Sequence, residues 1–278
     1  MKLKSVLLVL FLSFLLAGCG TKKATNPSDS KLKSLTTKLL INELPLKDRP
    51  FITLVPHATN RLFTFVGMNI NKAKESSVDL EYQSGDLLKG VKANIDSPIP
   101  NPFVKAIILG SCSTGGKCSF DKDLKSGTTK LKLNFAGQEA THLLKGDFTF
   151  VMGQKNLPDG KVSFEPSKLS AKENLILMNS FGLPKEIDKE TVLYPVIISS
   201  ANDKIISGIL SITSTATSAL IYDGTTFQPL KTITKDGQII VNLNQRPWSV
   251  SAEITRDDEK GSKESLKLYL LGPIVLIK

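Results

Sequence analysis

The chain has 278 residues, a formal net charge of +10 at pH 7 and only two histidines. Residues 20–49 contain seven basic residues against three acidic ones, and residues 50–278 carry a dilute basic excess with no dense Lys/Arg stripe interleaved with aromatic side chains. This distribution argues against a nucleic-acid-binding surface. No nucleic-acid partner is therefore expected. No cofactor is expected either.

The first 18 residues have the organisation of a secretory signal peptide. Lys2 and Lys4 form a basic start, and the run from Val6 to Leu16 is apolar except for Ser13. A helix needs about 20 apolar residues to span a bilayer, so this run is too short for a transmembrane segment. We predict that residues 1–18 are removed on export.

The signal ends in Leu16-Ala17-Gly18-Cys19, which resembles the lipobox of bacterial lipoproteins. The resemblance covers residues 1–20 and implies cleavage before Cys19 and attachment of lipid to its thiol. Two or three acyl chains anchor stably, since each buried methylene contributes about 0.8 kcal/mol. It also implies a place in the cell envelope, facing away from the cytoplasm. Gly20 stands where inner-membrane lipoproteins often carry Asp, which favours the outer membrane in a cell with two membranes.

Residues 19–49 are predicted to form the lipid anchor and a basic stalk. Leu32, Leu35 and Leu39 recur near helical spacing, which is compatible with a short amphipathic helix. The basic side chains either attract anionic lipid, at about 1 kcal/mol per residue near the surface, or keep a linker solvated.

From Phe51 onward, apolar residues alternate with polar ones, which is typical of half-buried strands in antiparallel sheets. In one such run, Phe148, Phe150 and Met152 are expected to share a buried face opposite Asp147 and Thr149. The pair Asp236-Gly237 lies between two runs and predicts a tight hairpin. The alternating runs are 78–83, 130–135, 147–152, 239–244, 250–254 and 266–270. The predicted fold class is all-β, with two antiparallel β-sandwich domains behind the signal peptide and stalk.

The predicted joint between the sandwiches runs from Gly153 to Gly160 and contains Pro158 and Asp159. It separates a first domain, residues 50–153, from a second, residues 160–278. The first domain resembles immunoglobulin-like and fibronectin-type modules only in its length and in the spacing of its predicted strands. In the second, residues 219–230 resemble a strand–turn–strand unit of bacterial surface β-domains, and the whole pattern resembles that of many uncharacterised bacterial lipoproteins.

Residues 171–181 can be read in two ways. Ser170 and Glu173 have capping-box spacing, which predicts a helix through the apolar run that follows. An apolar run as short as Leu175–Met178 also fits a buried strand, and the strand is slightly favoured.

Cys112 and Cys118 remain once Cys19 is committed to lipid, and they flank a turn that contains two glycines. In an oxidising compartment they are expected to form a disulfide across a hairpin end, and two free thiols are the alternative. A closed loop of about seven residues corresponds to roughly 2.4 kcal/mol in the chain-entropy model. A zinc site needs four ligands, and His57 and His142 are far apart in sequence, so no metal is expected.

The sequence contains no recognisable catalytic motif, such as a Gly-x-Ser-x-Gly elbow, a Gly-rich phosphate loop or His-Glu-x-x-His. His57 is expected in a turn and His142 near a strand start, and both are read as surface or packed residues rather than bases. The acidic cluster 257–259 either binds calcium or forms a solvated loop tip, which is favoured. Trp248 is the one candidate ligand contact, against a role in closing the core.

These features predict a membrane-anchored surface lipoprotein that acts as a non-enzymatic binding or structural module of the cell envelope. Its expected partners are the membrane, through lipid on Cys19, and an unidentified protein or glycan of the envelope. No catalytic residue is assigned. The alternative is an envelope hydrolase with a pair of carboxylates that a single sequence does not reveal.

Overall fold

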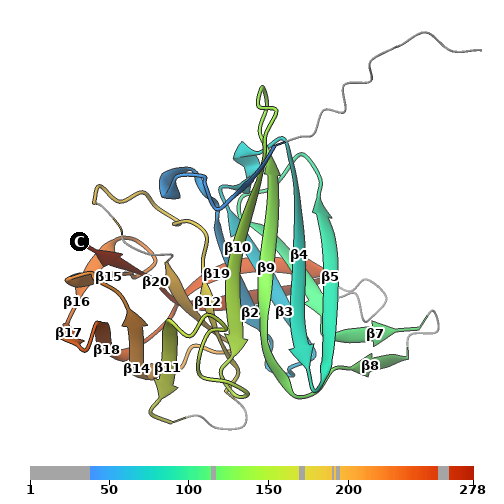
Figure 1. Ribbon diagram of the computed structural model, residues 1–278. Coiled ribbons are helices and arrows are strands. Elements are labelled where there is room, and N and C mark those ends of the chain that lie inside the picture. Colours follow the sequence, from blue (N-terminus) through green and yellow to red (C-terminus); the bar gives the residue numbers. More distant parts are fainter. Residues whose placement is uncertain (1–37, 114–116, 169–172, 190, 192–194, 256–262) are drawn as a thin grey trace, which may run out of the picture. The chain divides into compact units, whose positions relative to one another are not determined.

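Strands make up almost all the regular structure of the computed structural model, which describes residues 38–113, 117–168, 173–189, 191, 195–255 and 263–278 (Figure 1). The all-β prediction is confirmed. The only helical elements among these residues are two short 3-10 turns, η2 (Leu46–Asp48) and η3 (Ile70–Lys72). Within the described ranges, no helix is long and apolar enough to cross a membrane.

One large sheet runs through both halves of the folded part. Its main path is antiparallel throughout, and the short strand β1 (Leu39–Ile41) adds to β10 in parallel, while β19 (Trp248–Thr255) pairs with β20. In spatial order the path is β16 (Phe227–Leu230), β15 (Ser218–Tyr222), β20 (Lys263–Ile277), β13 (Val196–Ser200), β12 (Leu175–Asn179), β10 (Thr141–Phe150), β9 (Leu124–Asn134), β4 (Glu75–Ser84) and β5 (Leu87–Ile95).

Three smaller sheets complete the described fold. The first has the order β2 (Phe51–Pro56), β3 (Leu62–Met68) and β6 (Phe103–Ile108). The second has the order β11 (Val162–Pro166), β14 (Ile206–Thr213), β18 (Gln238–Gln245) and β17 (Thr232–Lys235). The third is the hairpin of β7 (Gly110–Cys112) and β8 (Cys118–Phe120).

Two hydrophobic cores lie on opposite faces of the strands that the halves share. Ile197 of β13 belongs to the core that includes β2, β3 and β4, whereas its neighbour Ile198 belongs to the core that includes β11, β14 and β18. β12 divides in the same way, with Met178 in the first core and Leu177 in the second. This follows because successive strand residues point to opposite faces.

The arrangement does not confirm two separate sandwiches joined near residues 153–160. β10 and β12 flank that segment and pair directly with each other, so the sheet continues across it. Residues Thr37–Lys278 form one compact unit. The segment is a turn in the chain, and the strands after it supply one face to each core.

β2 is buried at all six positions, although it lies at the edge of its own sheet. Buried serines bond to its free backbone groups. Ser199 Oγ donates to the carbonyl of Leu54, and the backbone N–H of Ile52 donates to Ser180 Oγ at 3.4 Å. An unpaired buried backbone group is costly, so these hydroxyls explain why polar side chains occur in an otherwise apolar layer.

Most of the predicted alternation is confirmed. In β4, for example, Val78, Leu80 and Tyr82 are buried. The prediction for Met152 is wrong: it is 48% exposed because the chain turns after β10, where the N–H of Gly153 bonds to Phe150 O. Thr149 is fully buried, and its hydroxyl lies within hydrogen-bond distance of the carbonyls of Lys125 and Gln154.

One local ambiguity is settled, and one predicted hairpin is confirmed. Residues 175–179 form strand β12 rather than a helix, while residues 169–172 lie outside the described ranges. The hairpin at Asp236-Gly237 is confirmed, since Lys235 of β17 pairs with Gln238 of β18. Both turn residues have positive φ, 51° and 73°, as a tight two-residue hairpin requires.

The hairpin of β15 and β16 turns at Asp223-Gly224, within residues 219–230, which resemble a strand–turn–strand unit. The carboxylate of Asp223 accepts hydrogen bonds from the backbone N–H of Thr226, the hydroxyl of Thr225 and the backbone N–H of Thr225. These donors hold the pKa of Asp223 well below its usual range, because they favour the charged carboxylate.

The folded part begins earlier than predicted. The stalk was placed at residues 19–49, but β1 pairs with β10 and Leu44 is 7% exposed. Arg49 secures this segment by donating from Nε to Leu44 O at 2.6 Å and from a terminal nitrogen to Asn42 O at 2.8 Å. Leu39 therefore lies in a strand, not in a helix, because the apolar run it begins can pair with a neighbouring sheet edge. Residues 19–37 lie outside the described ranges.

Candidate functional site

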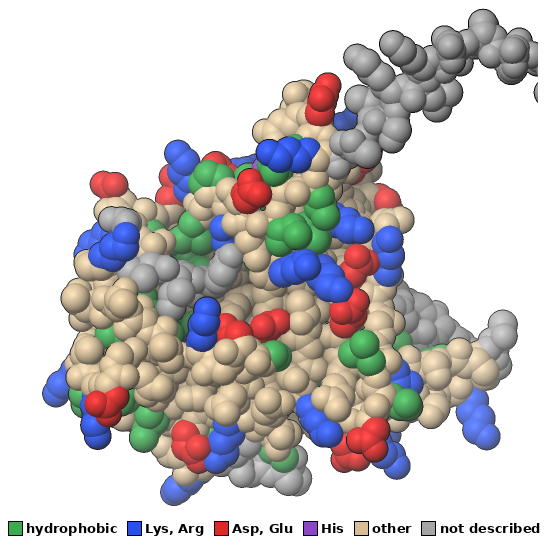
Figure 2. All heavy atoms as spheres, in the orientation of Figure 1, with side chains coloured by type: hydrophobic (Ala, Val, Ile, Leu, Met, Phe, Trp, Pro, Cys, Tyr) green, Lys and Arg blue, Asp and Glu red, His purple; other side chains and the backbone are tan. Residues whose placement is uncertain are grey.

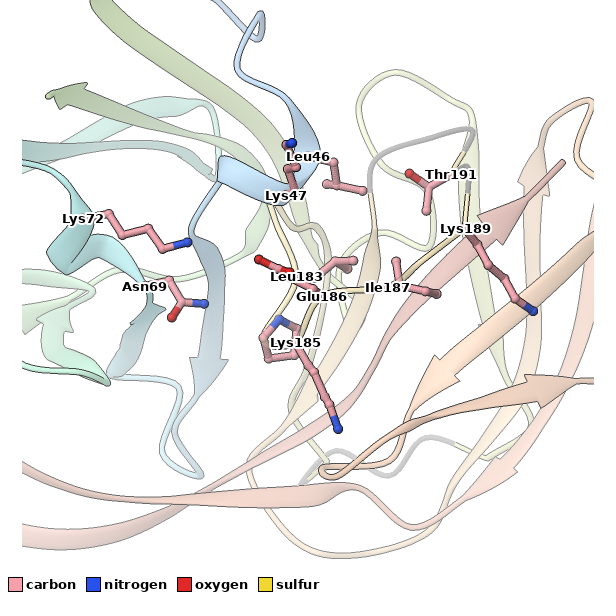
Figure 3. A pocket seen from close by; sticks show the side chains of 11 residues that line it. Leu46, Lys47, Asn69, Lys72, Leu183, Lys185, Glu186, Ile187, Lys189 and Thr191 are labelled. Atoms are coloured by element: carbon pink, nitrogen blue, oxygen red, sulfur yellow. The ribbon is translucent and has the colours of Figure 1, made fainter. Parts of the chain in front are cut away.

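A cleft of about 430 Å³ lies where three segments distant in sequence meet (Figure 3). One wall comes from η3 and the residue before it, a second from η2, and a third from the loop 183–189 that follows β12. The volume falls within the usual range for small-ligand pockets.

The η3 wall is held in place by Ile70, which is 2% exposed. Gly67 makes room for it, since a Cβ at that position would lie 2.1 Å from Ile70 Cδ1. Asn69 has φ 65°, and its backbone N–H donates to Asn101 Oδ1 at 3.0 Å. This bend places Asn69 and Lys72 along the same side of the cleft.

The loop wall is brought close by another glycine. A Cβ at Gly182 would lie 2.1 Å from Arg49 O, so only glycine permits this approach of the loop to the segment that follows η2. Beyond it, Leu183 is 8% exposed and packs with Val275. Leu46 and Ile187 are partly buried against the same cluster. The cleft therefore has an apolar floor.

Charged groups line the rim. Among the cleft's four lysines, Lys185 donates to Thr225 O at 3.2 Å. Figure 3 shows the amino group of Lys72 and the carboxylate of Glu186 pointing toward each other across the cavity, while Lys185 and Lys189 extend away from its centre.

The unpaired lysines of the rim are Lys47, Lys72 and Lys189. None of them has an ion-pair or hydrogen-bond partner among the described residues. Such a rim can bind negative charge, and the floor can bind an apolar group. The described lining holds no histidine, cysteine or serine, and Glu186 is its one carboxylate. In the described ranges, no three His, Cys, Asp or Glu side chains come together to hold a metal ion.

Neither histidine lines this cleft. His57 is in the turn between β2 and β3, as predicted, with Nδ1 3.0 Å from Thr59 Oγ1. His142 lies near the start of β10, is 8% exposed, and packs edge-on against Phe135 at 5.5 Å. Its Nε2 lies 3.1 Å from Gln138 Oε1. His142 is therefore a packed histidine.

Trp248 is half-buried and its polar edge is used within the fold. The indole N–H donates to Gly272 O at 2.7 Å, and the ring meets Tyr222 edge-on at 5.4 Å. A Cβ at Gly224 would come within 2.9 Å of Trp248 Cβ, so the hairpin turn of β15 and β16 closes over it. This packing matches a core-closing side chain, and a ligand contact at Trp248 stays a prediction.

Cys112 and Cys118 form the predicted disulfide. They are a register pair of β7 and β8, with Cα atoms 4.0 Å apart. Cys19 and the acidic cluster 257–259 lie outside the described ranges, so lipidation and calcium binding stay predictions.

The pKa of Asp147, a half-buried carboxylate, lies above its ordinary value. Burial is the main cause of the raised pKa. The hydrogen bond from Thr128 Oγ1 at 2.9 Å lowers the pKa, and the negative charge of Asp159 raises it further. Asp147 lies in β10 and does not line the cleft. Only its raised pKa connects Asp147 with the hydrolase alternative.

The cleft residues were not anticipated from the sequence. Pro184-Lys185-Glu186-Ile187 has neither strand alternation nor a known motif, and Lys47 was assigned to the stalk. Comparisons with protein-family models, with curated proteins and with solved structures found no match.

Proposed function

We propose that this chain is a lipid-anchored surface protein of the bacterial envelope, and that its folded part binds a ligand in the cleft without catalysing a reaction. The lipobox-like residues 16–19 support the anchor, and the basic residues between Cys19 and Lys38 support closeness to anionic lipid. In a cell with two membranes, Gly20 favours the outer one.

The composition of the cleft carries the binding proposal. Its groups are ammonium ions, an amide, the hydroxyl of Thr191, apolar side chains and a single carboxylate. Hydrolysis by paired carboxylates needs a second acid close to the first, whereas recognition needs only complementary charge and an apolar contact. The cleft is thus better suited to binding than to acid–base chemistry.

The anchor is tested on the mature protein purified from envelopes. Mass spectrometry should show acyl chains on Cys19 at the N-terminus, and Cys19→Ala should release the protein from the membrane fraction. An unmodified N-terminus elsewhere in the chain contradicts the proposal.

Binding is tested with a chain of residues 20–278, which keeps every described residue but lacks the anchor. It should capture a specific component from solubilised envelopes, and Lys72→Ala should weaken the capture. Lys92→Ala is the control, because Lys92 is exposed on β5 and also has no partner among the described residues. Equal loss with both variants argues against the cleft.

The same chain is screened for peptidase, esterase and glycosidase activity. No turnover is expected. Turnover that disappears with Asp147→Asn would establish the carboxylate hydrolase in place of a binding protein. Turnover that disappears with His57→Ala and His142→Ala together would equally overturn the proposal.

A further inference from the structure

Two lysines of β9 in the main sheet lie beside acidic side chains of β4, whereas Lys92 of β5, in the same sheet, has no partner in the described ranges. Lys130 lies 2.6 Å from Glu81, and Lys132 lies 4.0 Å from Asp79. On the face shown in Figure 2, basic and acidic side chains are interspersed. The cleft instead places four lysines around one carboxylate, and three of the four are without a partner in the described ranges.

Unpaired ammonium groups beside a recess attract an anion. Lys47 and Lys72 lie on η2 and η3; Ile70 of η3 is buried, and Leu46 of η2 is partly buried against the small apolar cluster. Asn69, on the same side as Lys72, adds an amide that can donate a hydrogen bond. A hydrogen bond between charged groups is about twice as strong as one between neutral groups.

The apolar floor of the cleft adds a second requirement for the ligand. Leu183 is almost completely buried in a small apolar cluster, and Leu46 and Ile187, which pack against that cluster, are themselves only partly buried. A ligand that reaches the floor gains by removing these surfaces from water, at about 25 cal/mol per Å². A purely inorganic anion cannot make this contact.

We infer that the cleft binds a small organic anion, with a carboxylate or phosphate group on an apolar body. Lys72 and Asn69 hold the anionic group, and Lys47 adds positive charge at the rim. Leu46, Leu183 and Ile187 contact the apolar body. This inference rests on the proposed function, since it names the ligand class of the same cleft.

The test uses residues 20–278 and four probes: hexanoate, hexyl phosphate, acetate and hexylammonium. Binding is followed by amide chemical shifts. Hexanoate or hexyl phosphate should shift amides of residues 46–47, 69–72 and 183–189, and the tighter of the two identifies the anionic group. Acetate should bind at least fivefold more weakly than hexanoate, because it lacks the apolar body. Hexylammonium should not bind.

The variant carrying both Lys47→Ala and Lys72→Ala should weaken binding of the preferred anion about tenfold, which is about 1.4 kcal/mol. Lys92→Ala, an exposed lysine outside the cleft, should leave the affinity unchanged. Equal thermal midpoints for the three proteins show that the variants are folded. Leu183→Met, which keeps the floor apolar, should retain binding.

The inference is overturned if hexylammonium binds as tightly as hexanoate, or if the double variant keeps its affinity within twofold. Shifts that map to another part of the molecule also overturn it, as does the absence of binding by any probe. In that last case, capture of an envelope component by the same chain would leave the proposed function standing, so the two failures are distinguishable.

Discussion

The buried hydroxyl of Tyr82 links strand β4 to Asp121 in the loop between β8 and β9. Tyr82 is 2% exposed and donates to Asp121 Oδ2 at 2.7 Å. Lys89 of β5 lies 3.4 Å from Asp121 Oδ1. Burial, followed by the hydrogen bond to Asp121 and its negative charge, raises the pKa of Tyr82 far above its ordinary value. The neutral phenol is therefore strongly favoured in the folded state.

This raised pKa predicts a pH dependence. Above about pH 10 the unfolded chain loses the phenol proton while the folded chain retains it. The contribution of Tyr82 to the free energy of unfolding is therefore complete below about pH 10 and falls as the pH rises above that value. Tyr82→Phe should lower the free energy of unfolding by about 1–2 kcal/mol at pH 7 and flatten its decline between pH 9 and 11. Urea unfolding measures both. Tyr269→Phe is the control, since the Tyr269 hydroxyl has no partner in the described ranges; equal losses would contradict the role of Asp121.

At the scale of elements, the hairpin of β17 and β18 depends on its two turn residues. Gly237 has φ 73°, and a Cβ there would meet nothing within 4 Å, so only backbone strain opposes a side chain. Gly237→Ala should cost about 1 kcal/mol in the free energy of unfolding. Gly90→Ala in β5, where φ is not positive, should be neutral or slightly stabilising. A neutral Gly237→Ala would show that the turn relaxes without cost.

The disulfide hairpin of β7 and β8 has no buried residue among those described. Its crosslink therefore stabilises the hairpin more than the cores. Replacing both cysteines, Cys112→Ser with Cys118→Ser, should abolish hydrogen-exchange protection of the hairpin amides. The global free energy of unfolding should fall by less than the roughly 2.4 kcal/mol of the chain-entropy model. A loss as large as that value would show that the hairpin unfolds together with the cores.

At the scale of the molecule, the shared strands predict a single cooperative unfolding transition. Ile197 and Ile198 are adjacent in β13, are both fully buried, and face different cores. Each change to Ala should destabilise by about 2–5 kcal/mol. Both should move the same thermal transition, observed by calorimetry and circular dichroism. Two transitions, each moved by only one variant, would instead support independent sandwiches.

Much of the local structure was evident from the sequence. The alternation in β4, β9 and β18, the turn at Asp236-Gly237 and the pairing of Cys112 with Cys118 all depend on residues close in the chain. A period of two specifies which face is buried, and positive-φ residues specify where a strand reverses. These signals were sufficient for the all-β fold class.

Strand partners and the cleft were decided only by the tertiary structure. β12 and β13 are buried at every position, so their sequences carry no alternation to show that one face serves each core. Lys47, Lys72 and Lys185 are separated by long stretches of chain, and nothing local marks them as neighbours. Their proximity depends on Gly67 and Gly182, where the absence of a side chain lets distant segments approach. Periodicity records which face of a strand is buried, but the partner of that face is set by packing across the whole fold.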